Sequence, residues 1–302
     1  MAQERAWLID ASIYIFRAWF SMPDNWRTAQ GQPVSAVYGY TRFLIDFIAR
    51  VGTQFHGAAA FDESLGSNYR NDIYPAYKSS RELPEEVLAF QLQACRKVTE
   101  LIGLPCYGGP RFEADDYLAS LASRFRASDI PVTVVTRDKD LGQIIVHPED
   151  RWWDYAADEE LNAGSFAQKF GVTPAQFADY LALVGDPIDD IPGVPGIGAK
   201  TASKLLQAFG DINGIKQSID DIPTLGIRGG QGVKDRLVEH WTDLLVWRQL
   251  TALECNIPEL GRMPTFTLQA EALEQVASYL TELGMDGPLI ARLRKLAPRS
   301  DR

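Results

Sequence analysis

Acidic residues recur in this chain directly after short apolar runs of the kind that form β-strands. The clearest of them are Asp10, Asp62 and Asp138. Like charges held close together repel and raise one another's pKa, so carboxylates do not gather at strand ends for stability. Oxygen-only side chains are the ligands that Mg²⁺ and Mn²⁺ prefer. The pattern therefore predicts a divalent-metal site supplied by several strands that are distant in the sequence.

Further acids extend this set. Glu113, Asp115 and Asp116 open a helix-like segment, where an N-terminal helix cap is the alternative explanation, although a cap needs fewer than three acids. Asp140 stands two positions after Asp138, so the pair can reach one cation from an extended loop, with a solvated loop as the alternative. The candidate metal ligands are Asp10, Asp62, Glu113, Asp115, Asp116, Asp138, Asp140, Asp186 and Asp189.

The elements that must position these acids alternate between short strands and longer helices over the first half of the chain. Strands are expected at residues 6–10, 58–62, 105–107, 132–136 and 152–155, and helical periodicity covers residues 37–51 and 87–102. This alternation predicts an α/β fold with a mostly parallel central sheet flanked by helices. Ligands of such sheets collect beyond the carboxyl ends of the strands, which is where the strand-end acids would lie.

The second half of the chain reads as helical and contains a glycine-rich turn between two helices. The turn has the pattern Pro-Gly-x-x-Gly-x-Gly, which predicts a helix–hairpin–helix that grips a DNA backbone without reading bases. A tight interhelical turn with no ligand is the alternative. The candidate DNA-binding residues of this turn are Gly193, Gly196, Gly198, Lys200 and Thr201.

Basic and aromatic residues alternate in the segment before the helix at residues 87–102. Such interleaving is typical of surfaces on which nucleic-acid strands stack and their phosphates are neutralised. Pro75 and two serines argue against one rigid helix, which favours a mobile arch over an ordinary exposed loop. The bases and rings of interest are Arg70, Tyr77, Lys78 and Arg81.

These segments predict a domain layout. Residues 1–165 would form the α/β domain, including the arch at residues 65–84. Residues 166–290 would form a helical domain with the helix–hairpin–helix at residues 183–210, and residues 291–302 would form a basic tail.

Composition limits the classes of protein to consider. The net charge is −10, and residues 111–190 hold 16 acids and seven bases, so the acidity is concentrated where most candidate ligands lie. Bound divalent cations would offset it, so acidity does not exclude DNA. Three separated cysteines favour neither disulfides nor a zinc motif. With no signal-peptide pattern and no membrane-length apolar run, we expect a cytoplasmic protein.

Together these blocks resemble the 5′-nuclease (flap endonuclease) family, including the N-terminal 5′-3′ exonuclease domain of bacterial DNA polymerase I. The similarity runs in order from about residue 6 to residue 260, and the chain looks like that domain standing alone. The residues that carry it are Leu8-Ile9-Asp10 with Tyr14, Arg17 and Ala18, then Phe61-Asp62, Tyr69-Arg70, Tyr77-Lys78-Ser79-x-Arg81, Glu113-Ala114-Asp115-Asp116, Thr136-x-Asp138-Lys139-Asp140, and the stretch from Leu183 to Thr201. Asp190 stands where the family usually has Asn, and Ala11 where Gly is common.

The resemblance implies a PIN-like 5′-nuclease fold and two-metal phosphodiester hydrolysis with Mg²⁺ or Mn²⁺. It assigns Asp10, Asp62, Glu113, Asp115 and Asp116 to one metal, and Asp138, Asp140, Asp186 and Asp189 to the other. It also assigns catalytic roles to Lys78, Arg81 and Arg70, DNA contact to Tyr77, and a K⁺ ion to the hairpin.

The function that the resemblance implies is a structure-specific 5′-3′ exonuclease or 5′-flap endonuclease of the kind used in DNA replication and repair. The expected partner is DNA with 5′ ends or flaps. We expect the protein to act as a monomer and not to associate with a membrane. A non-catalytic protein that binds branched DNA is the alternative. A related RNA-directed nuclease is less favoured, because such domains usually lack the glycine-rich hairpin.

Overall fold

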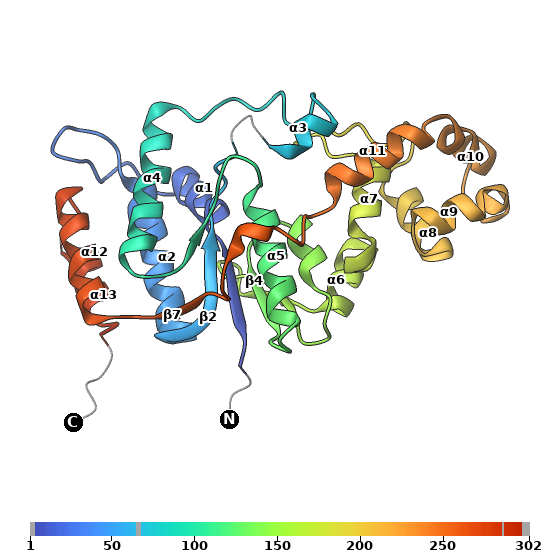
Figure 1. Ribbon diagram of the computed structural model, residues 1–302. Coiled ribbons are helices and arrows are strands. Elements are labelled where there is room, and N and C mark those ends of the chain that lie inside the picture. The colour runs from blue at the N-terminus through green and yellow to red at the C-terminus, as the bar shows by residue number, and fades with distance from the viewer. Residues whose placement is uncertain (1–3, 65–67, 286, 298–302) are drawn as a thin grey trace.

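One seven-stranded sheet forms the centre of the molecule. The protein is described as a computed structural model that covers residues 4–64, 68–285 and 287–297 (Figure 1). The strands run in the order β3-β2-β1-β4-β5-β6, and β7 pairs with β2 off this path. Their bounds are β1 (Ala6–Asp10), β2 (Gln54–Ala60), β3 (Cys106–Tyr107), β4 (Val132–Val135), β5 (Arg151–Asp154), β6 (Glu159–Leu161) and β7 (Thr265–Thr267).

The inner strands are parallel, as the sequence predicts. In the register of β1, Leu8 lies opposite Ala58 of β2 on one side and Val134 of β4 on the other. Leu8 and Ile9 are both fully buried, because helices cover both faces of the sheet. The β-branched run Val132–Val135 is buried throughout, which suits a central strand. Among the strands of the described residues, β6 pairs antiparallel with β5 and β7 pairs antiparallel with β2.

Two apolar cores lie on the two faces of this sheet. Leu8 and Val134 belong to the core that includes α5, whereas Ile9 and Val135 belong to the core on the side of α1, α2 and α4. The bounds of the helices around the sheet are α1 (Ala11–Ser21), α2 (Ser35–Val51), α3 (Tyr69–Ile73), α4 (Glu86–Leu101), α5 (Ala114–Arg126), α12 (Ala270–Glu282) and α13 (Pro288–Arg294).

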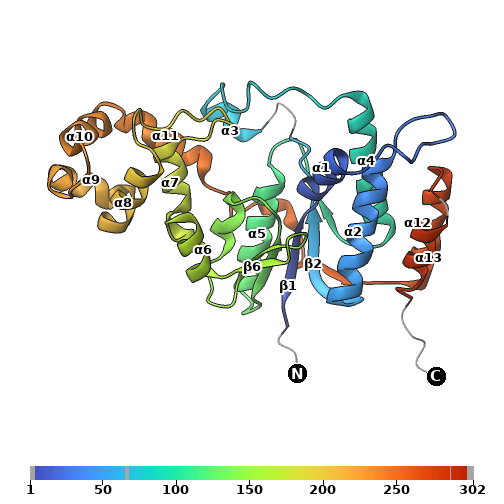
Figure 2. The same cartoon turned by 180° about the vertical axis from the view of Figure 1, so that it is seen from behind.

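A helical region extends to one side of the sheet (Figures 1 and 2). It contains α6 (Ala163–Phe170), α7 (Phe177–Val184), α8 (Ala199–Phe209), α9 (Ile212–Gln217), α10 (Gly230–Glu239) and α11 (Trp241–Thr251), with short 3₁₀ turns η1 (Asp140–Ile144), η2 (Pro174–Gln176), η3 (Ile219–Thr224) and η4 (Pro258–Leu260). The predicted fold class is confirmed: a mostly parallel sheet flanked by helices and followed by a helical region.

The chain does not stay in the helical region to its end. After α11 it returns to the sheet, where Phe266 of β7 pairs with Phe55 of β2. Helices α12 and α13 then pack against α4 and α2. The domain boundary predicted at residue 290 therefore differs from the observed path, in which residues 265–294 lie with the α/β part. Residues 65–67 and 298–302 of the predicted arch and tail lie outside the described residues. None of the helices in the described ranges has both the length and the apolar character that spanning a bilayer requires.

Candidate metal centre

The carboxyl ends of β1, β2 and β4 bring Asp10, Asp62 and Asp138 to one edge of the sheet. Asp10 ends β1 and caps α1, where its Oδ1 accepts the Ile13 amide at 3.2 Å. The hydroxyl of Thr136 donates to Asp10 Oδ2 at 2.8 Å and accepts the amide of Asp138 at 2.9 Å. These hydrogen bonds connect the ends of β1 and β4 directly. Parallel pairing thus assembles the acids as the sequence predicts.

Ser12 fixes the third strand end, a role that the sequence analysis missed. Its hydroxyl accepts the backbone amide of Asp62 at 2.8 Å, so the first turn of α1 holds the loop after β2. Thr136 acts in the same way for the loop after β4. Ser12 stands two positions after Asp10, and Thr136 stands two positions before Asp138. A hydroxyl residue close to an acid is a weak sequence signal, because serine and threonine are common in loops.

Negative charge at this edge has little compensation. Burial, together with the charges of Asp138 and Asp62, raises the pKa of Asp10 to about 7, although the hydrogen bonds from Thr136 and Ile13 act in the opposite direction. Burial, followed by the charges of Asp138 and Asp10, raises the pKa of Asp115 well above its usual value. Burial and Asp138 raise the pKa of Asp140 to about 7. Oxygen donors with this excess of charge fit a divalent cation, which would favour the ionised forms.

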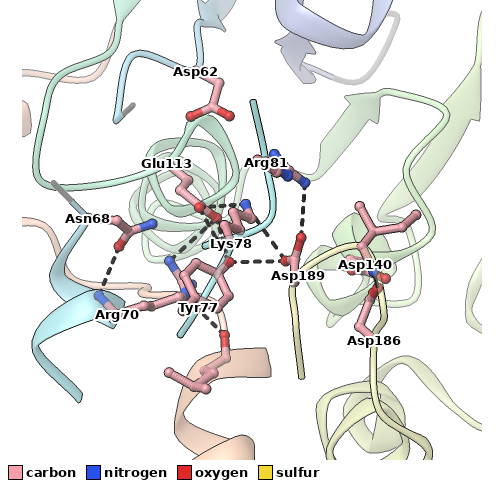
Figure 3. Close-up of polar contacts among 12 residues, drawn as sticks. Asp62, Asn68, Arg70, Tyr77, Lys78, Arg81, Glu113, Asp140, Asp186 and Asp189 are labelled. Atoms are coloured by element: carbon pink, nitrogen blue, oxygen red, sulfur yellow. Dashed lines mark hydrogen bonds and ion pairs between the residues drawn. The ribbon is translucent and has the colours of Figure 1, made fainter. Parts of the chain in front are cut away.

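The two predicted ligand groups border the same small space. A cavity of about 30 Å³ is lined by Glu113 and Asp115 of α5 and by Asp140, Asp186 and Asp189. Figure 3 shows Asp140 close to Asp186, with Asp189 between this pair and Glu113. Within the described ranges, however, no three His, Cys, Asp or Glu side chains lie close enough together to hold an ion as they stand.

Side chains of the arch occupy part of that space. Lys78 Nζ lies 2.5 Å from Glu113 Oε1 and 3.7 Å from Asp189 Oδ2. The hydroxyl of Tyr77 lies 3.1 Å from Glu113 Oε2 and 3.0 Å from Asp189 Oδ2 (Figure 3). Burial alone would raise the pKa of Glu113, but the charges of Lys78 and Arg70 and these hydrogen bonds lower it. Arg81 also contacts this cluster, with its Nη2 at 2.9 Å from Asp189 Oδ1.

Arg70 and Asp116 form a buried pair beneath the site. The two terminal guanidinium nitrogens of Arg70, Nη1 and Nη2, each donate to an Asp116 oxygen at 2.7 Å. Nε donates to the carbonyl of Leu250, and Nη2 also donates to that of Ala252. Asp116 in addition accepts the amides of Glu113 and Glu254. All charged atoms of the pair are therefore engaged, which opposes the predicted ligand role of Asp116 and catalytic role of Arg70. The arrangement holds the N-terminus of α5 instead.

The position of Tyr77 does not match its predicted contact with DNA, because this side chain too is engaged inside the protein. Only 3% of its surface is exposed, and its hydroxyl is bonded inside the site, so its ring is not available to stack on DNA in this arrangement. Beside it lies a larger cavity of about 560 Å³, whose lining includes the charged side chains of Asp62, Lys78, Arg81 and Glu113 and the apolar side chains of Phe16 and Leu83.

The glycine-rich hairpin lies between α7 and α8. Gly193 has φ of +69°, and a Cβ there would lie 2.3 Å from the backbone nitrogen of Gly185, so only glycine allows this approach. Gly196 also has a positive φ, and Gly198 is the N-cap of α8. Lys200 and Thr201 lie in the first turn of α8, with Lys200 exposed. The structure thus has a tight glycine-containing turn between two helices at this position, whereas its predicted contact with DNA stays a prediction.

Family models match most of the chain. Residues 5–171 match the model of the 5′-3′ exonuclease N-terminal resolvase-like domain, and residues 172–274 match that of the 5′-3′ exonuclease C-terminal SAM fold. DNA polymerase I of Rhizobium leguminosarum is 37% identical over 225 residues, which cover 72% of this chain and 22% of the relative. DNA polymerase I of Thermus thermophilus is 32% identical over 303 residues. The aligned region covers 95% of this chain and 34% of the relative. The chain thus spans about a fifth to a third of the length of these relatives.

Solved structures share the fold at low sequence identity. The bacteriophage T5 5′-exonuclease with bound zinc has a TM-score of 0.65 at 18% identity, covering 97% of this chain and 100% of that one. The bacteriophage T5 flap endonuclease in a pseudo-enzyme–product complex with DNA and metal ions has a TM-score of 0.65 at 17% identity, covering 97% and 98%. The catalytic core of Rad2 in complex with a DNA substrate has a TM-score of 0.62 at 15% identity, covering 97% and 91%.

Proposed function

Since the chain belongs to the 5′-3′ exonuclease family, we propose that it is a Mg²⁺-dependent nuclease that hydrolyses phosphodiester bonds in DNA carrying 5′ ends or 5′ flaps. One observation carries the proposal. Asp10 and Asp115, whose pKa values are raised by burial and by neighbouring acids, lie at the edge of the sheet where Asp62 and Glu113 share one cavity with the cations Lys78 and Arg81. Acids whose pKa values are perturbed by burial and by neighbouring charges, gathered beside a cavity, are typical of functional sites.

The ligand assignments follow the carboxylates at this edge that are not bonded through both oxygens to a buried arginine. Asp10, Asp62 and Asp115 would hold one cation, and Asp138, Asp140, Asp186 and Asp189 the other. Glu113 would join the first group once Lys78 has turned away from it. Asp116 is left out, because Arg70 and backbone amides engage both of its oxygens. Two bound cations would stabilise the charge on the attacking and leaving oxygens of the displacement.

The remaining steps belong to the protein's own groups. Burial works against the charge of Lys78, but Glu113 and Asp189 raise its pKa, so the ammonium stays charged near neutral pH. When a phosphate enters, Lys78 and Arg81 would exchange their carboxylate partners for the phosphate oxygens and stabilise the negative charge that develops there. The apolar wall with Phe16 and Leu83 would exclude water from one side of the strand.

The hairpin would hold the duplex part of the substrate. The backbone amides at the start of α8 and the exposed ammonium of Lys200 suit contact with consecutive phosphates, which would give binding without sequence preference. We also propose that this turn binds a K⁺ ion and that the protein acts as a monomer.

A panel of labelled DNA substrates tests the proposal. A 5′-flap duplex, a nicked duplex, a gapped duplex and a single strand should be incubated with Mg²⁺, with Mn²⁺ and with EDTA. We expect cleavage near the 5′ junction or end with either metal and none with EDTA. Tight flap binding without cleavage under every metal condition would instead support a non-catalytic protein that recognises branched DNA. The same assay with matched RNA flaps distinguishes a DNA nuclease from the RNA-directed alternative.

A further inference from the structure

The arch is attached to the loop after α7 by contacts that surround the proposed metal centre. The backbone amide of Lys78 donates to the carbonyl of Asp189 at 3.1 Å. The amide of Ser80 donates to Asp190 Oδ2 at 2.8 Å. Two consecutive aspartates thus accept the amides of Lys78 and Ser80 in the arch, and of the two aspartates it is Asp189 that lines the small cavity between the ligand groups.

Asp190 is unusual in its backbone conformation. Its φ is +57°, in the left-handed region that favours glycine, and Lys78 on the other side of the contact has φ of +52°. Glycine would relieve the strain at position 190 but would remove the carboxylate. Strained positions persist where the surroundings fix them, and they cluster at functional sites. The side chain of Asp190 therefore has a use that offsets its backbone cost.

The same loop leads directly into the hairpin. The backbones of Asp186 and Ile191 exchange hydrogen bonds at 2.8 and 2.9 Å, which closes the loop that contains Asp190. Gly193 follows and packs against Gly185. A displacement of the hairpin would consequently move the carboxylate of Asp190 and, through Ser80, the arch.

We propose that Asp190 is a positioning residue that fastens the arch to the hairpin loop, so that duplex held at the hairpin sets the place of Lys78 and Arg81 over the scissile phosphate. Asp190 touches neither substrate nor metal and acts through the Ser80 amide. The catalytic part of this inference rests on the proposed nuclease function, whereas the attachment itself does not.

Three variants separate the effect of the Asp190 side chain from the effect of its backbone conformation. Asp190→Gly removes the carboxylate and suits the positive φ, so it deletes the contact without adding strain. Asp190→Asn keeps an oxygen acceptor and should restore the contact. Asp129→Gly is the matched control, because Asp129 is an exposed aspartate with φ of +58° that lies elsewhere, after α5.

The first measurement is amide hydrogen exchange of residues 76–84 in the free protein with EDTA. Loss of a hydrogen bond to a carboxylate should speed exchange in this segment by about tenfold in Asp190→Gly, with wild-type rates in Asp190→Asn and Asp129→Gly. Unchanged exchange in Asp190→Gly would overturn the attachment. This readout does not depend on whether the protein cleaves DNA.

The second measurement separates binding from turnover on a 5′-flap duplex. We expect Asp190→Gly to lower the single-turnover cleavage rate by about tenfold while the Kd measured in EDTA stays within about twofold, and Asp190→Asn to restore the rate. An equal rate in Asp190→Gly and wild type would overturn the catalytic part. Absence of cleavage by the wild-type protein would instead refute the proposed function and leave the exchange result standing.

Discussion

The ammonium of Lys78 lies 2.5 Å from Glu113 and 3.7 Å from Asp189, and so joins carboxylates of the two proposed ligand groups. In this arrangement the arch supplies the positive charge that the site needs. A metal ion and a phosphate would together replace that contact, the metal at the carboxylates and the phosphate at the ammonium. Under the proposed function, the site would exchange one set of ionic partners for another.

Replacing Lys78 by Met should lower the cleavage rate on a 5′-flap duplex by about 100-fold, because a charge that stabilises the transition state is lost. Binding of the duplex in EDTA should change little, since the hairpin would provide most of it. Single-turnover kinetics and fluorescence anisotropy measure the two quantities. Lys97→Met, on the exposed face of α4, is the control and should match the wild type. A Lys78→Met variant with full activity would remove Lys78 from the mechanism.

Asp115→Asn should lower cleavage by about 100-fold or more while raising the melting temperature of the metal-free protein. The activity falls because a proposed ligand is lost, and the stability rises because the folded state no longer holds a carboxylate whose pKa is raised by burial and by Asp138. Calorimetry in EDTA and the flap assay with Mg²⁺ measure the two effects. A variant that lost activity and stability together would indicate a structural role instead.

The metal-free protein should lose stability as the pH rises from about 5 to about 8 through titration of Asp10 and Asp140. Their pKa values are raised to about 7 in the folded protein, so the folded state binds more protons than the unfolded chain in this range. The resulting stability is present at low pH and is lost as the pH passes through the folded pKa. Excess Mg²⁺ should flatten the profile.

Thermal unfolding of the wild type and of Asp140→Asn, each in EDTA and in Mg²⁺, isolates this effect. Glu113 has a lowered pKa and contributes with the opposite sign, so the comparison between the two proteins is more informative than either profile alone. The difference between them should grow with pH in EDTA. A difference that is constant with pH would contradict the titration of Asp140.

Arg70→Ala should destabilise the protein by about 3–5 kcal/mol, because it leaves the buried Asp116 without its partner. Arg70→Lys should recover little of the loss, since an ammonium does not reproduce the two parallel hydrogen bonds. Urea denaturation measures both variants. Arg111→Ala removes an exposed ion pair with Asp72 and should cost less than about 1 kcal/mol. A similar cost for Arg70→Ala and Arg111→Ala would contradict the structural role.

The central sheet was predictable because its inner strands carry unambiguous signals. β1 and β4 are short, apolar and buried on both faces, so their existence and the position of Asp10 and Asp138 followed from the sequence. β7 was missed because its three residues alternate between exposed and buried, which is too short a pattern to distinguish from a loop. β6 is equally short.

The site was predictable in composition but not in the roles of every member. Arg70 reads as one of several bases near tyrosines, and nothing local shows that it is buried. Its partners are Asp116, 46 residues away, and the carbonyl of Leu250, 180 residues away. The packing of α3 against α11 brings Arg70 to the carbonyl of Leu250, and Asp116 reaches it from α5. Tyr77 was assigned to DNA for the same reason, although its hydroxyl lies within the carboxylate cluster.

The return of the chain to the sheet at β7 has a mechanical consequence. The stretch from α6 to α11 leaves the α/β part after β6 and rejoins it at β7, so it is tethered at both ends like an insertion rather than suspended from one linker. A doubly tethered body can rock about the line through its two attachments but cannot swing freely. Any motion by which this body closes on a duplex is thereby restricted to a narrow path, along which residues 186–190 travel with it.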